Sequence, residues 1–297
     1  MKRALSLMAG LWLCLLTSAS ARAADAPCSE LAGAVNLSSL PSDDRRQFCQ
    51  FTKDTVAGGC CQSSLYVCLK SKPTCSRSSI LAEIGKAVIE TGATEEKAVA
   101  AAAAYEDGFA IEKRNTIDPS KAPCEGPKNG LVLAEFSDFD CPHCAVAAPL
   151  LQQLVAKGKG QGQGVRLCSF MFPLPGHHFS QLASAAALYA DSQGKFWPMA
   201  EALFATQSDR AEVDEEAYKN QLLKLGKKIG LDPLALAGAL KPGSSLLEKV
   251  KDQQMLGIGL LLQGTPSFFL EGHSLNGIPL SAFGTAIRDE RESKGQK

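Results

Sequence analysis

The chain has 297 residues, with 31 basic and 31 acidic side chains and a formal net charge of zero. Because the chain has no excess of basic residues, its charge does not favour binding to nucleic acid or to an anionic membrane surface, and neither is an expected partner. Proteins are the expected partners instead. The chain also has 11 cysteines, and their positions divide the sequence into parts.

The amino-terminal residues have the pattern of a secretory signal peptide. Residues 1–3 supply a positively charged start, residues 4–16 are almost wholly apolar, and residues 21–23 offer small side chains at the cleavage positions. The apolar stretch is too short for a comfortable membrane span, and no later segment is long and apolar enough to be one. We therefore expect residues 1–23 to be removed, leaving a soluble periplasmic protein.

The remaining cysteines are even in number, which favours disulfides in an oxidising compartment. The mature chain of about 270 residues exceeds the usual size of one domain, so we expect two. Six cysteines crowd into the region just after the signal segment, and the next is Cys124. These six are Cys28, Cys49, Cys60, Cys61, Cys68 and Cys75.

Residues 24–114 are predicted to form a small all-helical domain stapled by disulfides. Apolar residues at helical spacing over residues 80–89 predict one helix, and an alanine-rich helix follows over residues 94–108. Six cysteines allow 15 pairings, and the sequence does not choose among them, although adjacent Cys60 and Cys61 are expected to pair elsewhere. The alternative is a second redox centre that relays electrons to Cys141.

The residues that point to chemistry are Cys141-Pro142-His143-Cys144, at the end of the apolar run 131–136. A cysteine at a helix N-terminus faces unpaired backbone N–H groups and the positive end of the helix dipole, so Cys141 should be acidic and nucleophilic. Pro142 suits the first helical position, and His143 adds a donor or a positive charge. The alternatives are a static disulfide or half of a zinc site. No second CxxC or paired histidines complete a metal site, so neither metal nor cofactor is expected.

Residues 115–297 are predicted to form an α/β domain, entered through a linker or lead-in loop over residues 115–130. The predicted order is strand 131–136, helix 142–157, strand 165–170, a long helical stretch 178–262, two short strands and a final helix 280–291. A strand, helix and strand in this order imply a parallel pair of strands.

Four separated motifs then match one family. They are EFSDFDCPHC at residues 135–144, FPLPGH at 172–177, GKFW at 194–197 and GTPSFF at 264–269. Over about residues 115–292 the chain resembles the DsbA-like thiol:disulfide oxidoreductases. The resemblance implies a thioredoxin-like fold with a helical insertion and a redox-active dithiol.

The resemblance also implies roles for residues outside the dithiol. Pro266 would be a cis proline lying against the dithiol, and the backbone of Thr265 would pair with an extended substrate segment. Glu135 would be the buried acid that exchanges a proton with Cys144, with a raised pKa. The alternative for Glu135 is a solvent-facing side chain.

Four other residues are left with more ordinary roles. Asp138 and Asp140 are expected to be turn or rim residues. His177 and His178 are expected to be surface or capping residues, although they could border a substrate groove.

We expect the protein to be an exported enzyme that oxidises protein thiols. The resemblance also implies a membrane redox partner that restores the Cys141–Cys144 disulfide. Thr265 and the extra domain leave a disulfide isomerase or reductase as an alternative. A second alternative is a non-catalytic protein-binding module with a structural disulfide. Cys124 and Cys168 either bridge the lead-in loop to the second strand, or Cys168 is a buried free thiol.

Overall fold

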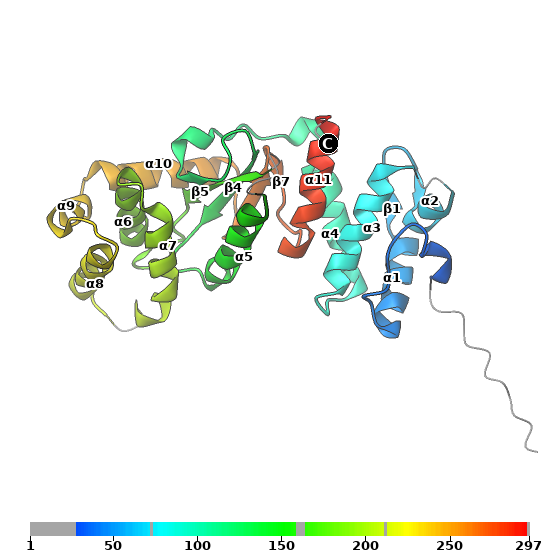
Figure 1. The fold of residues 1–297 in the computed structure, drawn as a ribbon, viewed down its shortest axis with the longest axis horizontal. Helices are drawn as coiled ribbons and strands as arrows, with labels where there is room; N and C mark the ends of the chain where they lie inside the picture. Colours follow the sequence, from blue (N-terminus) through cyan, green and yellow to red (C-terminus); the bar gives the residue numbers. More distant parts are fainter. Residues whose placement is uncertain (1–27, 72–73, 159–163, 211–212, 296–297) are drawn as a thin grey trace, which may run out of the picture.

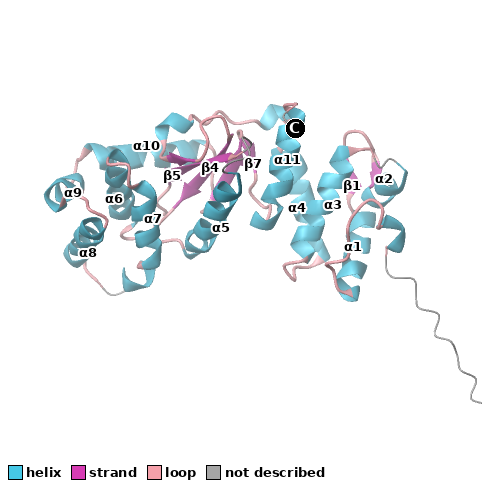
Figure 2. Cartoon of the chain, in the orientation of Figure 1, coloured by secondary structure: helices cyan, strands magenta, loops and turns pink. Residues whose placement is uncertain are grey.

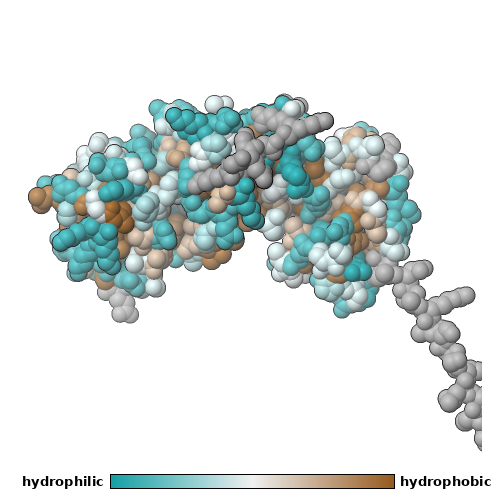
Figure 3. Space-filling model, viewed as in Figure 1, coloured by the Kyte–Doolittle hydropathy of each residue, from teal (hydrophilic) through white to brown (hydrophobic). Residues whose placement is uncertain are grey.

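The computed structural model describes residues 28–71, 74–158, 164–210 and 213–295. The expected signal segment, residues 1–23, lies outside this part of the chain. No helix among the described residues is long and apolar enough to cross a membrane. Figure 1 shows a helical region followed by a larger α/β region, and the face drawn in Figure 3 mixes hydrophilic residues with small apolar patches.

The amino-terminal region, which we call the module, is built from short helices and one small hairpin. The module contains α1 (Ser42–Asp54), β1 (Val56–Ala57), β2 (Ser63–Ser64), α2 (Leu65–Ser71), α3 (Ser76–Ile89) and α4 (Glu95–Gly108). Helices α1 and α3 pack closely at Gly85. A Cβ atom added there would lie only 2.1 Å from the Phe51 ring, so the contact requires glycine. Phe48, Phe51 and Ile84 are completely buried between these helices.

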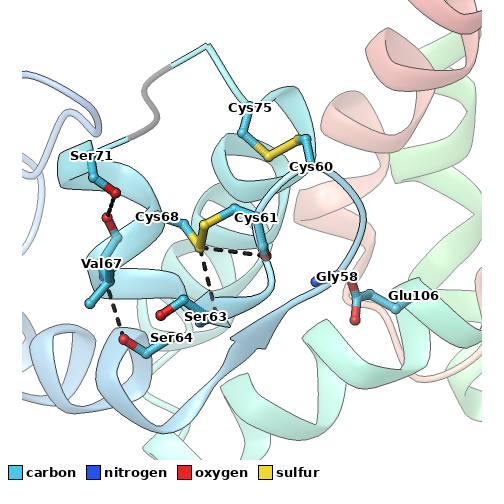
Figure 4. The surroundings of a disulfide bond; sticks show 10 residues. All are labelled: Gly58, Cys60, Cys61, Ser63, Ser64, Val67, Cys68, Ser71, Cys75 and Glu106. Carbon is cyan, nitrogen blue, oxygen red and sulfur yellow. Dashed lines mark hydrogen bonds between the residues drawn. A yellow bond between two sulfur atoms is a disulfide. The ribbon is translucent and has the colours of Figure 1, made fainter.

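Three disulfides staple the module, and Figure 4 shows two of them around α2. The pairs are Cys28–Cys49, Cys60–Cys75 and Cys61–Cys68. Adjacent Cys60 and Cys61 therefore pair with different partners, as predicted. The expected small helical region with disulfides is confirmed.

The α/β region is organised around a five-stranded sheet in the order β3-β5-β4-β6-β7. Its strands are β3 (Cys124–Glu125), β4 (Leu131–Ser137), β5 (Val165–Met171), β6 (Ser267–Leu270) and β7 (His273–Ser274). Strands β4 and β5 are parallel and joined through α5 (Pro142–Gly158), whereas the other pairs are antiparallel. Figure 2 shows helices around this sheet, so the predicted α/β class is confirmed.

The predicted long helical stretch consists of separate short helices in the described residues. They are α6 (Ser180–Ser192), α7 (Phe196–Ala205), α8 (Glu215–Lys228), α9 (Pro233–Ala239) and α10 (Ser245–Gly259). Residues of α6 to α10 form a hydrophobic cluster of their own, in which Tyr218 and Leu222 are almost completely buried. The last helix among the described residues is α11 (Phe283–Ser293), which is preceded by a single 3₁₀ turn, Leu280–Ala282.

The lead-in segment is partly ordered into the sheet, which the sequence pattern did not predict. Cys124 pairs with Cys168 across β3 and β5, and the two form a disulfide. Of the two alternatives left open for these cysteines, the bridge is therefore the one present. A buried glutamine, Gln253, adds a second tie: it accepts from Met171 N and donates to Lys121 O, at 2.7 and 2.6 Å.

The module packs directly on the carboxy-terminal end of the α/β region. One continuous hydrophobic cluster joins α3 and α4 to Phe268, Phe283 and Ile287. The Tyr105 hydroxyl, which is buried, donates to Asp289 on α11. The domain boundary expected at residues 114/115 stays a prediction, because the cores on its two sides are in contact.

Candidate active site

The two cysteines of the CPHC motif lie where β4 passes into α5. Cys141 precedes the helix, and its N–H donates to Asp138 O at 3.1 Å. Cys141 is 4% exposed and Cys144 is completely buried, whereas the Pro142 and His143 between them are exposed. Both are free thiols in this structure. A partner molecule would therefore approach Cys141 past Pro142 and His143.

The surroundings of Cys141 favour its thiolate. The Cys144 thiol, the adjacent Thr265 side chain and the backbone N–H groups of Cys144 and His143 lower the pKa of Cys141 to about 5, against the opposing effect of burial. When protonated, the Cys141 thiol donates to Thr265 O at 3.3 Å. Cys141 is thus ionised at neutral pH, which is the state needed for attack on a disulfide.

Cys144 has the opposite character. Its donation to Cys141, its burial and the nearby charge of Glu135 all raise the pKa of Cys144 far above the ordinary range of a thiol. The dithiol is therefore asymmetric: the pKa of Cys141 is lowered, whereas that of the completely buried Cys144 is raised.

Glu135 lies on β4 and is buried, at 4% exposure, rather than solvent-facing. Burial raises the pKa of Glu135 to about 7. Its Oε1 has no hydrogen-bond partner among the described residues. The side chain lines a pocket of about 720 Å³ between α5, α7 and the sheet. A carboxyl with this pKa can both give and take a proton near neutral pH.

The turn between β4 and α5 is fixed by buried polar contacts that the sequence analysis did not anticipate. Asp138 is completely buried and accepts from Leu174 N at 2.8 Å and from the Ser180 hydroxyl, and its Oδ2 lies 2.7 Å from His177 Nδ1. Of the two expected places for Asp138, the turn is the one present, and its completely buried carboxylate is the acceptor at the centre of that turn. In the sequence, the one indication of these contacts is His177, the histidine of the FPLPGH motif.

Asp140 is anchored in a comparable way by the helical insertion. It forms a buried ion pair with Arg210, which also donates to Phe139 O at 2.8 Å and to Leu203 O. The Phe179 N–H donates to Asp140 at 3.2 Å. The sequence does not predict the role of Arg210, because a single arginine in a polar segment belongs to no recognisable motif.

The loop before β6 brings a distant segment onto the dithiol. Register explains the placement: Phe136 near the end of β4 pairs with Ser267 at the start of β6, so the residues before Ser267 lie beside those after β4. The Thr265–Pro266 bond is cis, as the resemblance implies. Thr265 O is the atom in contact with Cys141 Sγ.

All seven residues singled out from the sequence therefore lie in or beside one site. They are Glu135, Cys141, Pro142, His143, Cys144, Thr265 and Pro266. Among the described residues, no group of three or more His, Cys, Asp or Glu side chains could hold a metal ion. The chemistry that this arrangement supports is thiol–disulfide exchange with proton transfer.

Comparison with known proteins gives a family and several relatives. A family model described as Thioredoxin matches residues 126–289, more than half of the chain. The Na(+)/H(+) antiporter NhaA 1 of Salinispora arenicola is 30% identical over 190 residues, 59% of this chain and 27% of that protein. NhaA 3 of Salinispora tropica is 29% identical over 163 residues, 54% and 23% of the two chains. The chain spans about a quarter of the length of these curated relatives.

Solved structures are similar as well. Oxidised BdbD from Bacillus subtilis has a TM-score of 0.52 and 21% identity, covering 60% of this chain and 97% of that one. A thioredoxin-like oxidoreductase from Silicibacter pomeroyi has a TM-score of 0.48 and 28% identity, covering 59% and 94%. The likeness to BdbD and the family match confirm the predicted fold class.

Proposed function

Because the chain belongs to the thioredoxin family, we propose that it is a thiol:disulfide oxidoreductase that exchanges disulfides with protein substrates through Cys141 and Cys144. The observation that carries the proposal is the geometry of the dithiol. Cys141 and Cys144 are both free thiols at the start of α5; Cys141 Sγ lies 3.3 Å from Thr265 O, and Cys144 is completely buried behind it. The lowered pKa of Cys141 agrees with this arrangement.

The reaction begins with Cys141 and Cys144 joined. A substrate thiolate attacks Cys141 Sγ, the bond between the two sulfurs breaks, and Cys144 leaves as a thiolate that takes up a proton. A second substrate thiolate then attacks the substrate sulfur of the mixed disulfide and releases Cys141 as a thiolate. The substrate loses two electrons, and the dithiol gains them.

Glu135 is the group positioned to handle the Cys144 proton. Its charge acts on Cys144, and its own pKa of about 7 allows proton release and uptake at neutral pH. The carboxyl lines a pocket whose other walls are α5 and α7, and Thr265 and Pro266 are not among its lining residues. Glu135 acts here as a proton carrier for the buried sulfur.

We further propose that the direction of exchange is oxidation of the substrate. A thiolate stabilised at Cys141 stabilises the reduced dithiol, which raises the reduction potential and makes the disulfide an oxidant. The effect is fully present above the pKa of an ordinary thiol and is lost as the pH falls through about 5, the pKa of folded Cys141. The helical, disulfide-stapled module differs from the strand-rich dimerisation domain expected of an isomerase.

The test combines two measurements on the purified protein. Titration of the Cys141 thiolate by ultraviolet absorbance should give a midpoint near pH 5. Equilibration in glutathione buffers should give a potential more oxidising than about −200 mV. A potential well below that of the glutathione pool would make the protein a reductase.

The location and partners follow from the same proposal. Three module disulfides and the Cys124–Cys168 bridge suit an oxidising compartment, and the signal-like start of the chain suits export to the periplasm. The reduced dithiol must then pass its electrons to an acceptor. We propose a membrane redox partner for that step.

A further inference from the structure

The pocket that Glu135 lines is far larger than the transfer of a proton requires. Its volume of about 720 Å³, between the sheet, α5 and α7, is in the range of ligand sites. Three carboxyl side chains line it, whereas none of its described lining residues is a lysine, an arginine or a histidine. We call it the acidic pocket; its carboxyl groups belong to Glu125, Glu135 and Glu201.

Strand register places two of these carboxyl groups on the floor of the acidic pocket. Glu125 pairs with Leu167 across β3 and β5. Glu135 pairs with Ser169 across β4 and β5. Because Leu167 and Ser169 are two residues apart, they and their partners face the same side of the sheet, and all four line the pocket. The acidic floor is therefore built into the sheet itself.

The acidic pocket contains hydrogen-bond acceptors that the protein itself does not use. Glu135 is 4% exposed, and its Oε1 has no hydrogen-bond partner among the described residues. Pro149 lies inside α5 and has no N–H, so the Ala145 carbonyl lacks the usual helical donor four residues later. Both of these α5 residues line the pocket. Because a buried acceptor without a donor is unfavourable, a ligand that supplies an N–H group here gains affinity.

The wall that α7 contributes is aromatic. Phe196, Trp197 and Phe204 line it, and the rings of Phe196 and Trp197 meet edge to face with centroids 4.9 Å apart. The face of an aromatic ring, above all that of tryptophan, attracts a cation. The opposite wall, from α5, includes the buried Leu151. An occupant that fits this lining has an apolar body and a positively charged group.

The rim of the acidic pocket lies between α5 and α7. Pro149 on α5 and both Pro198 and Glu201 on α7 are exposed lining residues. The described lining residues include neither cysteine of the dithiol and no residue of the cis-proline loop. A ligand can therefore enter without crossing the surface at which a substrate meets Cys141.

We propose that the acidic pocket binds a small organic cation, a protonated amine whose nitrogen donates to Glu135 Oε1 and whose apolar body lies against the rings of α7. No covalent bond forms or breaks, so the ligand is an effector and not a substrate. An amine paired with Glu135 would keep that carboxyl from exchanging a proton with Cys144. This effect on exchange rests on the proposed function, whereas binding itself does not.

Binding can be measured through Trp197. The sequence has two tryptophans, Trp12 and Trp197, so Trp12→Phe leaves the tryptophan of the acidic pocket as the only one. Phenethylamine, which is protonated at neutral pH, should change this fluorescence saturably. Hydrocinnamate, an aromatic carboxylate of similar size, should not. No saturable change with the amine, or an equal response to the carboxylate, would overturn the proposal.

Two variants locate the ligand. Glu135→Gln keeps the shape of the side chain but removes its charge, and above pH 7, where the carboxyl is mostly ionised, it should weaken phenethylamine binding about tenfold. Because the variant no longer buries a charge, it should fold. Glu216→Gln, at an exposed carboxyl on α8, is the matched control and should bind as the wild type does. Unchanged binding in Glu135→Gln, or equal weakening in both variants, would overturn the site.

The effect on exchange separates this proposal from the proposed function. Saturating phenethylamine should lower kcat for oxidation of a thiol peptide about tenfold and leave KM unchanged. A raised KM at constant kcat would place the amine on the substrate side and overturn the acidic pocket as its site. Cys141→Ser should bind the amine as tightly as the wild type does. A wild-type protein that binds the amine but oxidises no peptide would overturn the proposed function and leave the ligand site standing.

Discussion

Cysteines lie at the start of helices in both regions of the molecule, with different results. Cys75 precedes α3 in the module and is bonded to Cys60. Cys141 precedes α5, is free, and has a pKa lowered to about 5. The helix terminus is common to both, so it does not by itself make an exchange centre. What distinguishes Cys141 is a second thiol one helical turn away and the Thr265 segment folded over it.

The largest expected difference between the two regions is in catalysis. Cys141→Ser should reduce exchange with a thiol peptide by at least about a thousandfold, because the hydroxyl is not ionised at neutral pH and cannot form a disulfide. Stopped-flow or discontinuous assays of peptide oxidation measure the loss. Retention of most of the activity would place the reacting sulfur elsewhere.

The module disulfides should instead affect stability. Replacing both Cys61 and Cys68 by alanine should lower the free energy of unfolding of the module by about 2–4 kcal/mol, since the bridge restricts the unfolded chain. Denaturation followed by circular dichroism measures the change. The potential of the Cys141–Cys144 pair should remain that of the wild type. A large shift in that potential with intact stability would revive the idea of a relay through the module.

Glu135→Gln tests the proton carrier. Because burial raises the pKa of Glu135 to about 7, the native state binds a proton that the unfolded state has released, so stability falls as pH rises from about 4.5 to 7. The variant should therefore gain about 3 kcal/mol of unfolding free energy above pH 7 and lose about tenfold in exchange rate. Glu201→Gln, an exposed carboxyl on the rim of the same pocket, is the matched control. Equal effects in both variants would contradict the assignment.

The smallest effect is expected at His143. Its backbone N–H contributes to the lowered pKa of Cys141, and its side chain is exposed. His143→Ala keeps that N–H, so the Cys141 thiolate should still titrate below about pH 6. A shift to an ordinary thiol value would show that the imidazole ring supplies the effect.

Much of the fold, and the place of the free dithiol between β4 and α5, could be predicted because both depend on local pattern. The apolar run at 131–136 and the CPHC motif after it correspond to β4 and the start of α5. The pairings in the module were not predictable, because all six cysteines lie close together in sequence. Strand β3 was missed, since two residues within a loop rich in proline and glycine carry no periodicity.

The polar contacts around the site were missed for another reason. Asp138, Gln253 and Arg210 are far apart in sequence from most of the groups that they bind. Nothing in their neighbouring residues distinguishes them from ordinary surface side chains. Thr265 and Pro266 were found only because a family motif surrounds them. Partners that meet through strand register or helix packing need the folded structure.

The tie between Arg210 and Asp140 bears on how small a working version of this protein could be made. The helical insertion supplies the guanidinium for Asp140, and its α6 supplies the Ser180 hydroxyl for Asp138. A trimmed chain that kept the sheet and α5 but lacked the insertion would leave two enclosed carboxylates without these donors. Any shortened version of this scaffold should therefore replace both aspartates when the insertion is removed.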